Sequence, residues 1–291
     1  MGCGSYTAGD WSKLRKSRNI TKDTTEQIFT ASKLNPKYNP FYVDKRESRD
    51  SDDHPNSTPI VIGVDVTGSM GYLSTQIIKE SLNELMMQLY STNVVEDPQL
   101  LFAAIGDVVD KAPLQVTQFE SDIRIAEQLL DLWLEKCGGD LPEDYELLWY
   151  FCARHTDTDA WRKRNKKGFC FTIGDAPCHH ELKSADIKRI FNTVTDDISS
   201  ATCATEASKT YELFHIMIHK PNALVPTITF ESMIPGRVLT IDREEIQYLP
   251  ELIISTMLLV NGMSKNDVLE RLNPQAKEIV ARSISNIILI H

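Results

Sequence analysis

The sequence lacks the features that would direct the protein across or into a membrane. Its longest apolar run, Leu252 to Val260, is too short and too interrupted to span a bilayer. Its N-terminus, MGCGSYTAGDWSKLRKSR, has no apolar core of the kind that a signal peptide contains. Its six cysteines include no C-x-x-C pair, so we expect free thiols in a reducing compartment. These absences predict a soluble, cytoplasmic protein.

Basic residues are in a minority. The chain has 31 Lys and Arg against 41 Asp and Glu, and its net charge is −10. Proteins that bind nucleic acid through bulk electrostatics need the opposite balance, so we expect no nucleic-acid partner and no membrane partner. An acidic chain can instead hold a divalent cation. A length of 291 residues with 42% hydrophobic residues fits one α/β domain with appendages.

The composition changes twice along the chain, which predicts three segments. Residues 1–57 form an N-terminal arm, and its charged end, 45-KRESRDSDDHPNSTP-59, is interpreted as a linker or an extended strap. Aromatic residues in the arm predict that part of it packs on the domain. Residues 58–260 form the main domain, and residues 261–291 form a C-terminal helical extension.

Residues 58–260 alternate between apolar strands and helical segments. Strands are expected at 60–65, 100–106, 114–119, 169–174 and 211–219, and helices at 70–90, 121–136, 142–155, 181–192 and 244–259. This order has one strand-to-strand step and otherwise repeats strand then helix. It predicts an α/β fold with a doubly wound, mainly parallel central sheet and the strand 60–65 in its middle. The Ser/Thr-rich stretch 193–210 fits either a mobile loop or a polar helix.

Oxygen-bearing side chains follow the predicted strands. In an open parallel sheet, ligands bind at the carboxyl ends of the strands. These ends and one helix start carry the sequences Asp65-Val66-Thr67-Gly68-Ser69, Gly106-Asp107, Gly138-Gly139-Asp140 and Gly174-Asp175. Carboxylate and hydroxyl oxygens from several loops are what a hard cation such as Mg²⁺ requires. The spacing of the first sequence lets one tight turn direct three oxygens to one point.

The same stretches resemble the von Willebrand factor A (vWA) family. The sequence Asp65-x-Thr67-x-Ser69 is similar to the opening of the metal-ion-dependent adhesion site of that family. The resemblance covers about residues 58–260. Three further stretches resemble the loops of the bacterial and α-kinase-associated branch of the family: 102-FAAIGDVVDKAPLQVTQFESD-122, 138-GGDLPED-144 and 172-TIGDAP-177. The resemblance implies a Rossmann-like fold with the metal ligands described next.

The resemblance implies an Mg²⁺ or Mn²⁺ site in which Asp65, Thr67 and Ser69 come from the first loop and Asp175 from the third. The family usually presents Thr after Gly-Gly in the second loop, where this chain has Asp140. Asp140 could therefore bind the metal directly, through water or not at all. By the same resemblance, a partner Asp or Glu fills an open metal position, and the chain is an adaptor or scaffold that works beside an AAA-type ATPase or a kinase complex.

The alternative prediction is a Mg²⁺-dependent phosphotransferase or phosphatase with Asp65 as the nucleophile. The first loop also resembles the D-x-D-x-[TV] loop of aspartyl-phosphate enzymes. Thr67 stands where those enzymes place their second Asp, and a hydroxyl cannot act as the acid or base near pH 7. We therefore favour a non-catalytic binding module.

Several other polar residues have more ordinary interpretations. Asp107 fits a metal ligand as well as it fits a carboxylate that orients the first loop. Glu143 and Asp144 are typical of a helix N-terminus. The sequence Cys178-His179-His180 lacks a second ligand pair at zinc spacing, so we expect an exposed loop there. The basic run 162-RKRNKK-167 is expected to be a solvated connection.

Overall fold

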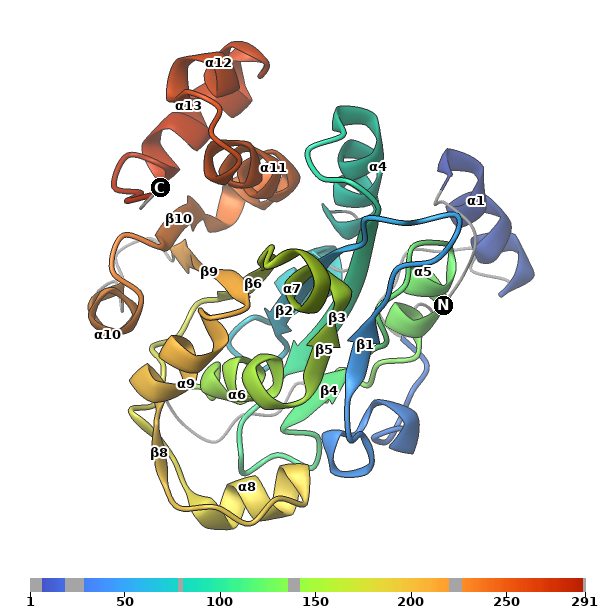
Figure 1. Ribbon diagram of the computed structural model, residues 1–291, viewed down its shortest axis with the longest axis vertical. Helices are drawn as coiled ribbons and strands as arrows, with labels where there is room; N and C mark the ends of the chain where they lie inside the picture. The colour runs from blue at the N-terminus through green and yellow to red at the C-terminus, as the bar shows by residue number, and fades with distance from the viewer. Residues whose placement is uncertain (1–6, 19–28, 78–80, 136–141, 220–226, 290–291) are drawn as a thin grey trace.

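The computed structural model describes residues 7–18, 29–77, 81–135, 142–219 and 227–289 (Figure 1). Its central sheet has six strands in the order β10-β9-β6-β2-β3-β4. Their bounds are β2 Thr58–Asp65, β3 Pro98–Ile105, β4 Leu114–Val116, β6 Gly168–Gly174, β9 Tyr211–His219 and β10 Val238–Asp242. Only β4 is antiparallel to its neighbour in this sheet. The predicted doubly wound, mainly parallel α/β fold is confirmed, with β2 in the middle.

The strand order creates a place where ligands can bind. The chain starts the sheet at β2, adds β3 and β4 on one side, and then returns to add β6, β9 and β10 on the other. Between β2 and β6 the direction of winding reverses, which leaves a crevice outside the carboxyl ends of these two strands. In the register of the sheet, Asp65 lies opposite Ile105, and Val64 lies opposite Ile173. The three strands β2, β3 and β6 therefore end at one level.

Alternate residues of each strand enter two separate cores, one on each face of the sheet. In β2, Ile60, Ile62 and Val64 belong to one core and Val61 to the other. Helices α4 Leu82–Thr92, α5 Arg124–Leu130, α11 Leu249–Val260, α12 Lys265–Glu270 and α13 Pro274–Ser283 contribute to the first core. Helices α6 Glu146–Arg154, α8 Ser184–Phe191, α9 Ser200–Ala207 and α10 Thr227–Met233 contribute to the second.

The remaining elements lie outside the central sheet and the helices named above. They are α1 Ala8–Ser17, η1 Pro36–Tyr38, η2 Pro40–Tyr42, α3 Tyr72–Gln76, α7 Asp159–Arg164, η4 Arg243–Tyr248, and the strand pairs β1 Arg46–Ser48 with β5 Thr156–Thr158 and β7 Glu181–Leu182 with β8 Ile198–Ser199. No described helix is long and apolar enough to cross a membrane.

The structure corrects several predicted bounds. The strand β10, at the edge of the sheet, was not predicted. The expected helix at 121–136 ends at Leu130, the helix at 142–155 begins at Glu146, and the helix at 244–259 starts as the 3-10 turn η4. Within the stretch 193–210, residues 200–207 are helical. The expected helix at 70–90 corresponds to α3 and α4, of which α4 extends to Thr92, and residues 78–80 lie outside the described part of the chain.

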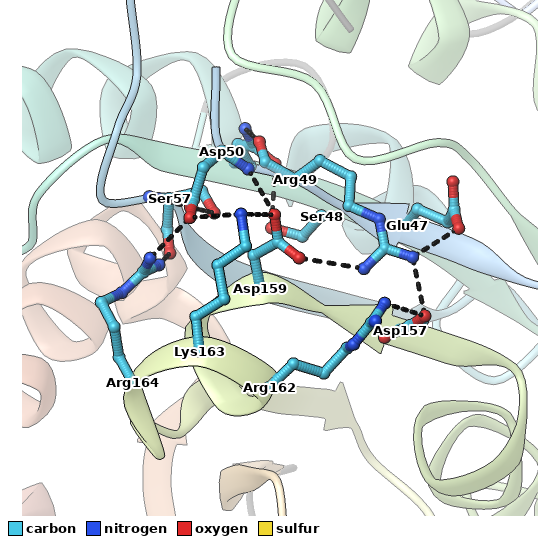
Figure 2. A network of polar contacts seen from close by, with 11 residues as sticks. Glu47, Ser48, Arg49, Asp50, Ser57, Asp157, Asp159, Arg162, Lys163 and Arg164 are labelled. Carbon is cyan, nitrogen blue, oxygen red and sulfur yellow. Dashed lines mark hydrogen bonds and ion pairs between the residues drawn. The ribbon is translucent and has the colours of Figure 1, made fainter. Parts of the chain in front are cut away.

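The N-terminal arm packs on the domain as a strap. Its strand β1 pairs in parallel with β5, the strand that connects α6 to α7 in the chain. Figure 2 shows the charged side chains that join the two segments. Arg49 donates to Asp157 at 2.7 Å and to Asp159 at 3.1 Å. Residues 45–59 were expected to be either a linker or an extended strap, and residues 46–49 form an extended strap.

The basic run before β6 is part of this attachment. Arg164 donates to Asp50 at 2.7 Å, and the Nζ of Lys163 lies 2.7 Å from the Asp159 carboxylate (Figure 2). The run is largely exposed, as expected of a solvated connection, and the Lys163 side chain is 57% exposed. Lys163 and Arg164 nevertheless also form ion pairs with Asp50, and these pairs fasten the strap.

Candidate functional site

The loop after β2 gathers three oxygen-bearing side chains. Asp65, the last residue of the strand, is completely buried. The backbone N–H and the hydroxyl of Thr67 both donate to Asp65 Oδ1, at 2.8 and 2.7 Å. The hydroxyl oxygens of Thr67 and Ser69 are 3.4 Å apart. This is an Asx-type turn, in which a carboxylate folds the next residues back over the strand end.

Gly71 allows the loop to continue into α3. Its φ of +56° lies in a region of backbone conformation that residues other than glycine rarely adopt. The residue precedes Tyr72, where α3 begins, so the turn and the helix meet within a few residues. A glycine here accommodates the backbone conformation that joins the turn to α3.

The loop after β6 brings the fourth residue. Ser69 Oγ donates to Asp175 Oδ1 at 2.6 Å, although the two residues are 106 positions apart in the chain. The structure therefore places Asp65, Thr67, Ser69 and Asp175 together at the point where the winding of the sheet reverses. Asp140, the fifth predicted ligand, lies in residues 136–141, outside the described part of the chain.

Tyr145 holds the second oxygen of Asp65 and was not predicted. Its buried hydroxyl donates to Asp65 Oδ2 at 2.8 Å. The ring can reach Asp65 because β6 ends in Gly174: a Cβ there would lie 1.9 Å from the Tyr145 hydroxyl oxygen. The position of the Tyr145 ring thus depends on the glycine at position 174, and no local pattern in the sequence indicates this contact.

Glu143 also lies in this group rather than in a helix. Its backbone pairs with the loop after β6, donating to Pro177 O at 2.9 Å and accepting from His179 N at 3.3 Å, and α6 begins only at Glu146. The side chain is 3% exposed, and its Oε2 has no hydrogen-bond partner among the described residues. The interpretation of Glu143 as a helix N-terminal residue is therefore wrong.

The carboxyl groups of the site destabilise one another's charge. Burial raises the pKa of Asp65 to about 6, against the effect of its hydrogen bonds with Thr67 and Tyr145, and the charge of Asp175 raises it further. Burial also raises the pKa of Glu143 to about 9, and the charges of Asp65, Asp107 and Asp144 act in the same direction. Among the described residues, Asp65 and Glu143 form no ion pair with a basic side chain.

The donor set fits a hard divalent cation. Around Mg²⁺, with metal–oxygen distances of about 2.1 Å, adjacent octahedral ligands lie roughly 3 Å apart. The separations of 2.6 Å for Ser69–Asp175 and 3.4 Å for Thr67–Ser69 lie on either side of that value. Each hydroxyl donates its proton to a carboxylate, so its lone pairs stay available to a metal. Thr67 and Ser69 can thus bind directly, with Asp65 and Asp175 orienting them.

No protein-family model matches the chain, and no curated protein matches it. Solved structures do. The pilus adhesin SpaC from Lactobacillus rhamnosus GG, in its open conformation, matches 74% of this chain with a TM-score of 0.46 and 10% identity, and the chain spans 31% of that adhesin's length.

Two shorter proteins match over nearly their whole length. The von Willebrand factor domain of the type V pili tip protein Mfa5 from Porphyromonas gingivalis has a TM-score of 0.47 and 8% identity, over 72% of this chain and 97% of that one. The conserved hypothetical protein BatB from Bacteroides thetaiotaomicron has a TM-score of 0.41 and 12% identity, over 69% and 98%. The fold assignment itself rests on the strand order and register of this chain.

Proposed function

We propose that the chain is a protein-binding module of the vWA type that uses a divalent cation, Mg²⁺ or Mn²⁺, held at the end of β2. The supporting observation is the convergence of Asp65, Thr67, Ser69 and Asp175 at the switch point of the sheet, with hydroxyl lone pairs available to a metal. When bound, the cation supplies a coordination position that a carboxylate of a protein partner can fill. Asp140 belongs to this proposal as a further ligand.

The rim of the site suits an acidic segment of a partner. Tyr72, at the start of α3, is 63% exposed. The Arg243 guanidinium lies over its ring at 5.7 Å and donates to Met70 O at 3.1 Å. An arginine fixed beside an exposed aromatic ring offers a partner both positive charge and apolar contact area. The proposed partner therefore carries an Asp or Glu next to an apolar residue, and a subunit of an AAA-type ATPase or kinase complex in the cytoplasm remains the proposed class.

The enzyme alternative is not favoured by the geometry of Asp65. A nucleophilic carboxylate must present an oxygen to its substrate, but Asp65 is fully buried and its two oxygens accept three hydrogen bonds. Incubation with a generic phosphomonoester, with and without Mg²⁺, tests this directly. Mg²⁺-dependent release of phosphate that Asp65→Asn abolishes would support the enzyme and contradict the binding module.

The proposal is tested by comparing two serines. Ser69→Ala removes a hydroxyl of the proposed site, whereas Ser74→Ala removes a buried hydroxyl of α3 that donates to Gly71 O, at the N-cap of that helix. We expect calorimetric titration of Mg²⁺ or Mn²⁺ to show binding to the wild type and to Ser74→Ala, and at least about tenfold weaker binding to Ser69→Ala. Capture of a partner from native lysate should likewise fail with Ser69→Ala or EDTA. Equal affinity of both variants for metal would refute the proposal.

A further inference from the structure

A second group of metal-ligating side chains lies beside the first site. Asp107 follows β3, Asp144 precedes α6 and His179 follows β6, and each offers one ligand atom within 4.8 Å of the other two. The His179 Nε2 and the Asp144 Oδ1 are 4.0 Å apart. The sequence Cys178-His179-His180 had no zinc-type partner in sequence, but folding supplies two carboxylates from segments that are 35 and 72 residues away from His179.

Backbone contacts hold these side chains in place. Val108 N donates to Asp144 Oδ2 at 2.6 Å, which ties the loop after β3 to the segment before α6. His179 N donates to Glu143 O at 3.3 Å, and Ser200 Oγ donates to His179 O at 2.6 Å. The three segments are thus fixed to one another independently of any side-chain contact between Asp107 and His179.

A simple ion pair between Asp144 and His179 leaves one oxygen unexplained. Asp107 is 1% exposed, and its Oδ1 accepts from Val109 N at 2.9 Å. Its Oδ2 is buried and has no hydrogen-bond partner among the described residues. An unsatisfied buried acceptor destabilises the fold, and more so when it is charged. Buried polar atoms in native folds usually have a protein, water or ligand partner, so this oxygen is a candidate metal ligand.

We propose that Asp107, Asp144 and His179 bind a second cation, of the kind that accepts an imidazole nitrogen together with carboxylate oxygens. This is Zn²⁺ or a similar transition metal such as Co²⁺, because Mg²⁺ prefers oxygen ligands alone. Tetrahedral ligands at about 2.0 Å from Zn²⁺ lie roughly 3.3 Å apart, so the 4.0 Å pair needs a shift of under 1 Å. The His179 side chain is 32% exposed, which gives it room to turn and leaves a coordination position open to solvent.

The inference goes beyond the proposed partner-binding function and stands without it. The first site consists of oxygens on β2 and β6 loops, whereas the second depends on a histidine and on the loop after β3. A cation held there would fasten the loops after β3 and β6 to the segment that carries Glu143. It would therefore stiffen one wall of the first site without contributing a ligand to it.

Cobalt provides the test, because Co²⁺ bound by nitrogen and oxygen ligands absorbs visible light and Mg²⁺ does not. The full chain, stripped with EDTA, is titrated with Co²⁺ in saturating Mg²⁺. We expect one Co²⁺ per chain in the wild type and in Asp65→Ala. His179→Gln and Asp107→Asn should weaken Co²⁺ binding at least about tenfold. His180→Gln is the matched control, since that exposed neighbour is not in the group.

Three results would overturn the inference. The first is that the wild type does not bind Co²⁺ in the presence of saturating Mg²⁺. The second is that His179→Gln and His180→Gln weaken Co²⁺ binding equally. The third is that Asp65→Ala loses Co²⁺ binding while His179→Gln retains it. The last result would place the Co²⁺ at the first site and so support the proposed function while refuting this second site. Retention of Co²⁺ in Asp65→Ala with loss in His179→Gln would establish the second site, whatever the fate of the first.

Discussion

At the scale of single residues, Asp65 is the residue on which the site depends. Three donated hydrogen bonds offset part of the cost of burying its carboxylate, and the charge of Asp175 adds to that cost. Two of the donors come from Thr67, within the same turn, and the third comes from Tyr145, across the crevice. The hydrogen bond from Tyr145 therefore fixes the orientation of Asp65 from the side opposite to the loop.

Tyr145→Phe tests this positioning role. The change removes the hydroxyl that donates to Asp65 Oδ2, and we expect a loss of about 1–2 kcal/mol in the free energy of unfolding. We also expect Mg²⁺ affinity to fall about tenfold, as for other outer partners of metal ligands. Tyr211→Phe is the matched control, because it removes an equally buried hydroxyl that donates to Thr156. Urea denaturation should show similar losses of stability in the two variants, and calorimetry should show unchanged Mg²⁺ affinity in Tyr211→Phe. Reduced Mg²⁺ affinity in both variants would contradict the positioning role of Tyr145.

Sequence and structure agree at this scale where the contact is local or follows from topology. Asp65, Thr67 and Ser69 occupy one turn, so their spacing alone predicts that they meet. Asp175 follows a parallel strand, so the common edge of the sheet brings it to them. Tyr145 and Glu143 approach through the packing of the segment before α6 against the loop after β6, which no spacing in the sequence specifies.

At the scale of elements, a strap was one of the two interpretations of residues 45–59, but the pairing of its strand β1 with β5 was not predicted. Strand β1 has three residues, all polar or charged, and it pairs with an equally short and polar β5. Apolar periodicity cannot reveal such a pair, because the ion pairs around Arg49 supply the contacts instead (Figure 2). The edge strand β10 escaped prediction for a related reason, since its five residues are too few for a clear pattern.

The strap should loosen in acid. The hydrogen bond from Arg49 lowers the pKa of Asp157, and in Asp159 the contacts of Lys163, Asp50 N–H and Arg49 outweigh the opposing effect of burial. A pKa below the unfolded value of about 3.8 means that the contacts stabilise the fold above that pH, and that the effect is lost as pH falls through the lower folded values. Arg49→Gln should cost about 1.5 kcal/mol at pH 7 and progressively less below pH 3.8.

Urea denaturation at several pH values measures this effect. Arg162 pairs with the same Asp157 at 3.1 Å, but its side chain is 59% exposed, against 19% for Arg49. Arg162→Gln is therefore the control, and it should change stability by less than about 1 kcal/mol. A loss as large as that of Arg49→Gln, or a loss in Arg49→Gln that does not depend on pH, would show that the network does not hold the strap.

At the scale of the whole molecule, the C-terminal helices α12 and α13 contribute buried side chains to the first core, on the same face of the sheet as α4, α5 and α11. Helix α13 packs on α11 and β10, and Ser283 Oγ donates to Thr240 O of β10. Buried aliphatic side chains from this segment join the core beneath α11; they are Val268, Ile279, Val280 and Ile284. The division of the chain at residues 57 and 260 stays a prediction, although both flanking segments contact the central domain.

Two isoleucines test whether the extension contributes to global stability. Ile284→Ala truncates a side chain that is 1% exposed and leaves a cavity, so it should lower the free energy of unfolding by about 2–4 kcal/mol. Ile288→Ala removes one that is 57% exposed and should change it by under about 1 kcal/mol. Urea denaturation should show one transition for the whole chain. A separate early transition in Ile284→Ala would mean that the extension unfolds as an independent unit.

Thermal unfolding of the EDTA-treated chain across a Mg²⁺ titration tests the central claim most directly. The wild-type midpoint should rise with Mg²⁺, by the equivalent of about 2.7 kcal/mol when Mg²⁺ reaches a hundred times its Kd. Asp159→Ala, which loses a buried carboxylate of α7 that contacts the strap, should start lower and rise by the same amount. Asp65→Ala should not rise at all. A wild-type midpoint that stays constant in both Mg²⁺ and Mn²⁺ would contradict the metal site and the binding function proposed from it.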